Sequence, residues 1–265
     1  MPTERRLSFG EVAELYDRVR PSYPAALVDD VLSFSGAAAG DRALEVGAGT
    51  GKATALFAAR GLEILALEPS SGMAAVASGT CAQYENVRIE QSEFERWRSD
   101  RRGFELLFSA QAWHWIPREL RYAKAREVLA PSGVLAVFWN RLSWDSSPLT
   151  DELAAIYRRV APDLGAGAGP GPMDPARASR ERWGDWGREL AEAPGFGPPE
   201  FRSYMWRERY TTDSYLELLR THSDHIVLDE PRRGQLFDAI AAVIDGRGGA
   251  IELDYVTDLW MARAE

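Results

Sequence analysis

Three glycines at alternate positions form the most distinctive chemical motif of this 265-residue chain. Gly47, Gly49 and Gly51 follow a short apolar run, and Glu45 stands two residues before the first of them. Glycine lets a backbone turn tightly and approach a ligand that a Cβ atom would exclude. The motif therefore predicts a turn between a strand and a helix that receives a cofactor.

Two common cofactor motifs match this turn poorly. A P-loop needs a glycine five residues before its Gly-Lys pair and Ser or Thr after it, but Val46 and Ala53 occupy these positions. The dinucleotide fingerprint has two residues before its third glycine, and here there is one. Glu45 also stands where dehydrogenases usually have an apolar residue. The sequence therefore does not contain a P-loop, and an NAD-dependent oxidoreductase remains a weakened alternative.

A second candidate residue, Glu68, ends the next apolar run, seventeen residues after Gly51. A carboxylate at this point can accept hydrogen bonds from both ribose hydroxyls of a nucleoside. The structural alternative is an acid that caps the helix after Pro69.

The chain has three histidines and one cysteine, Cys81, which leaves few ways to build a metal site. His114 lies between two tryptophans after an apolar run, and histidine titrates near neutral pH, so it is a candidate general base or a packed, orienting ring. His222 and His225 could share a helix face, but no third ligand is near. We predict no metal site, with His222 as a substrate-orienting residue or part of a solvated face.

Short apolar runs alternate with amphipathic stretches between residues 42 and 140, which is typical of a parallel sheet with crossover helices. The predicted strands are residues 43–47, 63–68, 87–91, 104–109 and 134–140, and the predicted helices are 52–60, 71–78 and 118–129. Right-handed crossovers then give a doubly wound sheet. The flanking helices are 9–16, 25–34, 151–160, 214–220 and 234–244, and residues 161–175 are rich in glycine and proline and predict a mobile loop.

The charge balance bears on the partners. Lys and Arg number 31 against 40 Asp and Glu, which gives a net charge of −9. This balance opposes nucleic acid, and no basic run suits a membrane surface. The first residues lack an apolar segment, and no window approaches the ~20 apolar residues of a membrane span. We expect a cytoplasmic protein, a monomer or homodimer, with a small-molecule substrate.

The motifs together resemble those of class I S-adenosylmethionine-dependent methyltransferases. The resemblance rests on Glu45 and the three glycines, on residues 67–70 with Met73, and on segments 92–95, 109–115, 121–124 and 129–133. Segments 16–24 and 219–223 are similar to the trans-aconitate-methyltransferase-like, type 11 group of small-molecule enzymes. A Gly-Asp-Ala adenine motif is replaced by Gln91, Ser92, Glu93 and Phe94.

The resemblance implies a Rossmann-like seven-stranded sheet, its last strand antiparallel, under a mostly helical cap. The implied divisions are an N-terminal flap (1–36), a cofactor core (37–140), and a split cap (141–200, 211–250) with the last two strands (201–210, 251–263). The implied S-adenosylmethionine contacts are Tyr16, Arg20, Glu45, Gly47, Ala48, Gly49, Gly51, Glu68, Pro69, Met73, Ser92, Glu93, Phe94, Ala110 and Gln111.

Methyl transfer is a displacement whose main demands are alignment and the exclusion of water, so a general base is optional. The acceptor pocket is predicted at aromatic side chains near the strand ends: Tyr23, Trp113, Trp115, Trp139 and Trp144. The activity implied is methylation of a small molecule, such as a natural-product intermediate or a small organic acid, with S-adenosylhomocysteine as product. The alternative is a cofactor-binding member without methyl transfer, such as a cyclase or a binding module.

Overall fold

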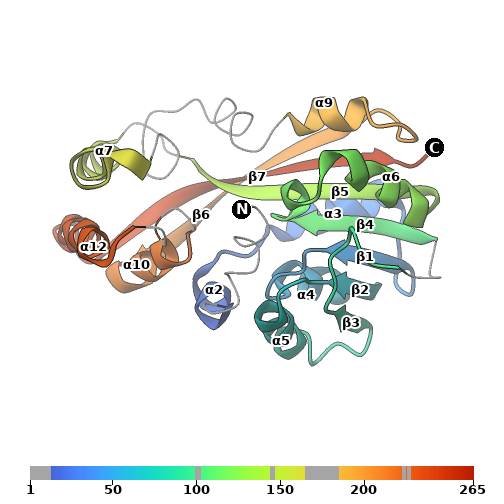
Figure 1. Cartoon of the computed structure of the whole chain (residues 1–265), viewed down its shortest axis with the longest axis horizontal. Coiled ribbons are helices and arrows are strands. Elements are labelled where there is room, and N and C mark those ends of the chain that lie inside the picture. The colour runs from blue at the N-terminus through green and yellow to red at the C-terminus, as the bar shows by residue number, and fades with distance from the viewer. Residues whose placement is uncertain (1–12, 99–102, 144–146, 165–184, 223–224, 226–227) are drawn as a thin grey trace.

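The computed structural model describes residues 13–98, 103–143, 147–164, 185–222, 225 and 228–265. One seven-stranded sheet runs through these residues in the order β3-β2-β1-β4-β5-β7-β6 (Figure 1). The strands are β1 (Arg42–Val46), β2 (Glu63–Leu67), β3 (Val87–Glu90), β4 (Phe104–Ala110), β5 (Leu129–Ser143), β6 (Glu200–Thr211) and β7 (Ala250–Arg263). Only β7 runs against its neighbours, which confirms the predicted fold class.

Alternate residues of the sheet face two different helical layers, as the period of two in a strand requires. On one face, Ala43 and Ile64 pack against α3 (Ala25–Ser35) and α4 (Lys52–Ala58). On the other, Leu44 and Leu65 share a cluster with α6 (Arg118–Val128) and α9 (Trp186–Ala191). Both faces of the parallel strands are therefore buried, which explains their nearly continuous apolar sequences.

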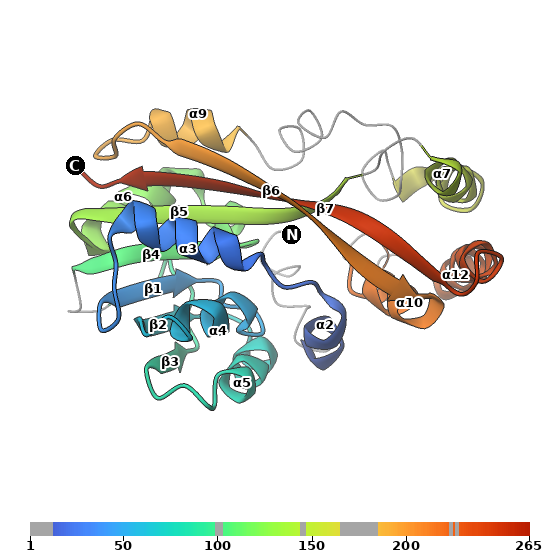
Figure 2. The same cartoon turned by 180° about the vertical axis from the view of Figure 1, so that it is seen from behind.

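The last three strands continue well beyond the parallel core. β6 and β7 pair at twelve successive positions, and their outer ends carry α7 (Pro148–Val160), α10 (Thr212–Arg220) and α12 (Glu230–Asp245) (Figure 2). A separate apolar cluster, which includes Leu153, Tyr215 and Ile240, holds these helices to the strands. The helices form a distal layer of the same sheet.

One short helix lies between these parts. α2 (Ala13–Val19) contacts α5 (Ser71–Thr80) in the core and α10 in the distal layer. The 3-10 turn η2 (Trp113–Trp115) follows β4, and η3 (Pro162–Leu164) follows α7. No helix among the described residues is long and apolar enough to cross a membrane.

Several predicted boundaries were wrong by a few residues. β5 begins at Leu129 and not at 134, because Leu129 already pairs with Phe104 of β4, before an irregularity in the register that ends at Val134. α12 begins at Glu230, four residues before its predicted start, because Asp229 accepts a hydrogen bond from the Arg232 amide and caps the helix there. The predicted helix 9–16 is described only from Ala13 and extends to Val19, and most of the predicted loop 161–175 lies outside the described residues.

Candidate functional site

The glycine turn after β1 has the backbone that its sequence requires. Gly47, Gly49 and Gly51 have φ angles of 77°, 58° and 86°, a region that favours glycine. A Cβ on Gly47 would lie 2.3 Å from the Cβ of Ala112, so the turn passes directly against the end of β4. A Cβ on Gly49 would have no described atom within 4 Å, so one side of the turn is open to a ligand.

Glu68 ties this turn to the end of β2. Its Oε2 accepts a hydrogen bond from the Gly49 amide and its Oε1 accepts one from the Ser70 amide, each at 2.9 Å. Ser70, and not Glu68, is the cap of α5. A carboxylate offers about four lone-pair sites, so these backbone bonds are compatible with further hydroxyl donors.

Glu45 is the most unusual charged side chain of the site. It is 0% exposed, and its Oε2 accepts a hydrogen bond from the Thr54 hydroxyl at 2.5 Å. Its Oε1 has no hydrogen-bond partner among the described residues. Burial raises the pKa of Glu45 to about 8, the Thr54 hydrogen bond opposes this shift, and the nearby charge of Glu68 adds to it.

This arrangement fits a cofactor that brings a positive charge and hydrogen-bond donors to the open side of the turn. An orphaned buried acceptor is costly unless a donor reaches it, and a cation satisfies it best. A pyrophosphate would instead meet the negative charge of Glu68 and would oppose ionisation of Glu45. The turn therefore suits S-adenosylmethionine, with its ammonium and sulfonium groups, better than a dinucleotide.

Some of the residues predicted near the adenine lie close to Glu68. The Ser92 amide donates to the Glu68 carbonyl at 3.1 Å, and Pro69 is half-buried. Met73 and Phe94 are 4% and 3% exposed, and Phe94 packs against Trp113 with ring centroids 6.2 Å apart. Glu93 forms an ion pair with Arg96 at 3.0 Å.

The N-terminal residues reach the site from α2. The Arg20 guanidinium lies 5.0 Å from the Tyr16 ring centroid and donates to the hydroxyl and carbonyl oxygens of Thr221, at 2.8 and 2.9 Å. Arg20 thus links α2 to the end of α10. The Tyr23 ring meets Phe138 edge-on at 4.9 Å, and burial raises its pKa well above the ordinary value, with smaller contributions from Tyr16 and Glu45.

The end of β4 contains a strained residue. Gln111 has a φ of 60°, which a non-glycine residue seldom adopts. Its amide donates to the Phe138 carbonyl at 2.9 Å, and its side chain donates to the Asn140 carbonyl at 3.1 Å. Ala110, the half-buried last residue of β4, precedes it. Sequence reasoning missed Asn140, whose side chain donates to the Ser22 carbonyl and accepts from Thr257.

The aromatic residues predicted to form the acceptor pocket lie in different surroundings in the structure. Trp113 is 0% exposed and packs against Phe94 and Tyr122, so the prediction of Trp113 as a pocket wall gives way to a place in the core. Trp139 is 4% exposed, and half-buried Trp115 lies beside His114 with ring centroids 4.7 Å apart. Trp144 lies outside the described residues.

The later histidines belong to the distal layer. His225 is 0% exposed, and its Nε2 shares a hydrogen bond with the Tyr157 hydroxyl at 2.7 Å. The half-buried His222 ring lies 5.6 Å from the His225 ring. The described residues contain no group of three or more His, Cys, Asp or Glu side chains that could hold a metal ion.

Comparison with known proteins places these features in a family. Residues 43–133 match the model of a methyltransferase domain. An uncharacterized methyltransferase of Mycobacterium tuberculosis is 35% identical over 142 residues, which cover 52% of this chain and 56% of that protein. A trans-aconitate 2-methyltransferase of Deinococcus radiodurans is 36% identical over 95 residues, 36% of each chain. The aligned part thus spans about half or less of these two relatives.

A solved structure from Anaeromyxobacter dehalogenans, provisionally assigned as a Type II methyltransferase, has the same fold. Its TM-score is 0.64 at 22% identity, over 92% of this chain and 97% of that one. The strand order, the glycine turn and these matches confirm the resemblance derived from the motifs. Residues 43–133 thus carry a methyltransferase domain, on the sheet expected of class I S-adenosylmethionine-dependent methyltransferases.

Proposed function

We propose that this protein binds S-adenosylmethionine and transfers its methyl group to a small-molecule acceptor. The observation that carries the proposal is Glu45, a fully buried carboxylate beside the open glycine turn. One of its oxygens lacks a donor among the described residues, and the neighbouring charge is another acid, Glu68. A site of this kind favours a cationic ligand.

Each group of the cofactor has a matching residue in this proposal. Glu68 accepts from the ribose hydroxyls, and Glu45 Oε1 accepts from the ammonium group directly or through water. Gly47, Ala48, Gly49 and Gly51 line the path of the methionine and ribose. Pro69, Met73, Ser92, Glu93 and Phe94 border the adenine, while Ala110, Gln111, Tyr16 and Arg20 border the methionine end.

The bound cofactor supplies an electrophilic methyl group on a sulfonium. The chain's own residues then have to align the acceptor with that methyl group and keep water out. The carboxyl ends of β1 and β4 meet at the glycine turn, where ligands of open α/β sheets gather. His114, Trp115 and Tyr23 are the described residues that we place on the acceptor side.

The acceptor is proposed to be a small organic molecule, an organic acid or natural-product intermediate. Two arguments support this class. The distal layer of α7, α10 and α12 extends from the same strands beyond the cofactor turn, and a relative methylates trans-aconitate by its name. A cytoplasmic location and a monomeric or homodimeric state remain predictions.

The proposal is tested by titration calorimetry of the native protein with S-adenosylhomocysteine. We expect saturable binding that Glu68→Ala weakens by roughly 100-fold or more, because two charged hydrogen bonds of about 1.5–3 kcal/mol each are lost. Glu63→Ala, an exposed acid at the start of the same strand, is the matched control and should bind like the native protein. Absence of binding, or tighter binding of NAD⁺, would refute the proposal.

A second assay separates methyl transfer from cofactor binding alone. The protein is incubated with S-adenosylmethionine and a panel of small carboxylic acids, trans-aconitate among them, and S-adenosylhomocysteine formation is followed. Acceptor-dependent product supports a methyltransferase. Tight cofactor binding without product from any acceptor class favours a cyclase or binding role.

A further inference from the structure

A chain of contacts leads from the protein surface to His114 through two stacked tryptophans. Trp139 of β5 lies parallel to Trp186 of α9, with ring centroids 4.6 Å apart and an interplanar angle of 14°. The Trp139 indole nitrogen donates to His114 Nδ1 at 3.4 Å. Both tryptophans are buried, at 4% and 5% exposure, so water competes little with this bond.

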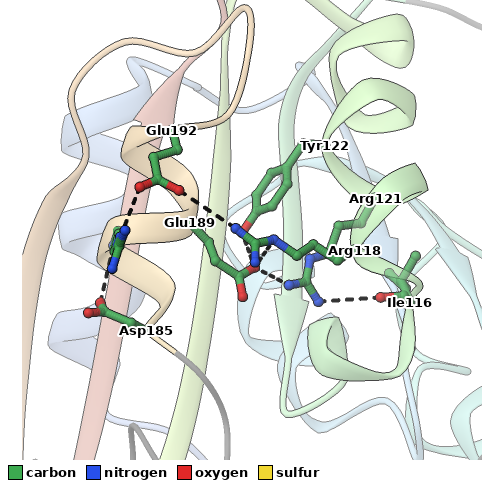
Figure 3. Close-up of polar contacts among 8 residues, drawn as sticks. Ile116, Arg118, Arg121, Tyr122, Asp185, Glu189 and Glu192 are labelled. Carbon is green, nitrogen blue, oxygen red and sulfur yellow. Dashed lines mark hydrogen bonds and ion pairs between the residues drawn. The ribbon is translucent and has the colours of Figure 1, made fainter.

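The outer end of this chain is a buried ion pair between α6 and α9. The Arg121 guanidinium lies over the Trp186 ring at 4.6 Å and pairs with the carboxylate of Glu189. Arg121 also donates to the Ile116 carbonyl at 3.3 Å, and the Tyr122 hydroxyl donates to Glu189 at 3.4 Å. Figure 3 shows Arg121 and Tyr122 of α6 and Glu189 of α9 pointing toward one another.

More exposed charges surround this pair. Arg118 lies 3.8 Å from Glu189 and 3.7 Å from Glu192, and Glu192 also pairs with Arg188 at 2.8 Å (Figure 3). The network fixes the six-residue helix α9 to α6 and so keeps Trp186 on Trp139. A short helix with little stability of its own needs such anchoring.

The contact at His114 has a direct chemical consequence. An indole N–H only donates, so the His114 nitrogen that faces it must carry a lone pair. Neutral imidazole has one protonated and one unprotonated nitrogen, so the proton is then on Nε2. To accept a proton at Nε2, the ring would have to move its own proton to Nδ1, against the indole N–H.

We propose that Trp139 is a positioning residue that holds His114 in the tautomer with its proton on Nε2. His114 then meets its partner at Nε2 as a hydrogen-bond donor and does not act there as a general base. An oxygen acceptor atom, such as a carboxylate or carbonyl of the substrate, is the kind of group that this tautomer orients. The catalytic meaning rests on the proposed function, whereas the tautomer itself does not.

The test uses nitrogen-15 NMR of the cofactor-free protein, so its result is independent of methyl transfer. The chain has three histidines, and His114→Ala identifies the His114 signals by their loss. We expect a lone-pair shift for Nδ1 and a protonated shift for Nε2 in the native protein. A native spectrum with the proton on Nδ1 would overturn the proposal without any variant.

Two matched variants then isolate the indole N–H. Trp139→Phe keeps an aromatic ring against Trp186 but removes the donor, and His114 should change from one tautomer to comparable populations of both. Trp186→Phe is the control, because the Trp186 nitrogen has no hydrogen-bond partner among the described residues, and it should keep the native tautomer. An unchanged tautomer in Trp139→Phe, or an equal change in both variants, would contradict the assignment.

Discussion

Two acids of this molecule, Glu189 and the fully buried Glu45, stand in opposite electrostatic surroundings. Glu189, whose side chain is 15% exposed, pairs with Arg121 and accepts from Tyr122. Glu45 is 0% exposed, receives one hydroxyl hydrogen bond, and has its pKa raised by burial and by Glu68. The first acid is matched by neighbours that the fold supplies. The second is only partly matched by its neighbours, which is why we propose Glu45 as a ligand-binding residue and Glu189 as a structural one.

The largest expected effect comes from breaking the matched pair. Glu189→Ala leaves the buried Arg121 charge without its carboxylate, and we expect the free energy of unfolding to fall by about 3–5 kcal/mol. The melting temperature should fall on the order of 10 °C. Thermal denaturation monitored by circular dichroism measures both quantities.

Glu192 provides the control for this variant on the same helix. Its side chain is 52% exposed, and exposed ion pairs contribute little to stability. Glu192→Ala should therefore melt near the native temperature. Equal losses in the two variants would show that burial of the pair is not what stabilises α9.

Glu45→Gln should raise the free energy of unfolding at high pH, where Glu189→Ala lowers it, and the change should be smaller. The folded-state pKa of about 8 lies above the ~4.3 of an unfolded glutamate, so the native state binds more protons between these values. The contribution of Glu45 to the free energy of unfolding is therefore greatest below about pH 4.5 and is lost as the pH rises through 8. We expect the variant to match the native protein at pH 5 and to exceed its stability by about 1–3 kcal/mol at pH 8.5.

Urea unfolding of both proteins at pH 5, 7 and 8.5 measures this difference. The same stability gap at all three values would show that Glu45 does not titrate in this range. Glu63→Gln, on an exposed residue of the neighbouring strand, should show no such pH dependence.

The smallest expected effect is in the number of protons released when the cofactor binds. If the cofactor's positive charge faces Glu45, binding favours the carboxylate and releases up to one proton at pH 7. Calorimetry in buffers of different ionisation enthalpy measures the number released with S-adenosylmethionine. Glu45→Gln should lower it to near zero. A native protein that releases no proton would place Glu45 among the structural acids, together with Glu189.

The sequence predicts the core of this fold because local and global signals agree there. Short apolar runs and Gly47, Gly49 and Gly51 predict five parallel strands and a cofactor turn, and the resemblance adds the last two strands. The structure contains all seven strands, and the last one, β7, is antiparallel as predicted. Helix α9 was missed, since its six residues are held by contacts with α6 that are distant in sequence.

The candidate site was predictable in its backbone and less so in its side chains. Glu45 and Glu68 follow from the ends of two strands, but their partners depend on how α4 and the glycine turn pack. The sequence could not show that Trp113 faces the core while Trp115 is half-exposed, because the 3-10 turn η2 sets their directions. Arg20 is joined to Thr221 across 201 positions, a contact that no local pattern encodes.

The long pairing of β6 with β7 constrains how the protein can be altered. Their twelve paired positions run from Glu200 opposite Met261 to Thr211 opposite Ala250, a ribbon about 40 Å long at ~3.3 Å per residue. Inserting one residue midway in either strand would reverse the faces of all later side chains. Insertions and grafted segments belong at the outer ends, beyond Thr211 or before Ala250. There a redesigned set of helices could be exchanged while the cofactor half keeps its register.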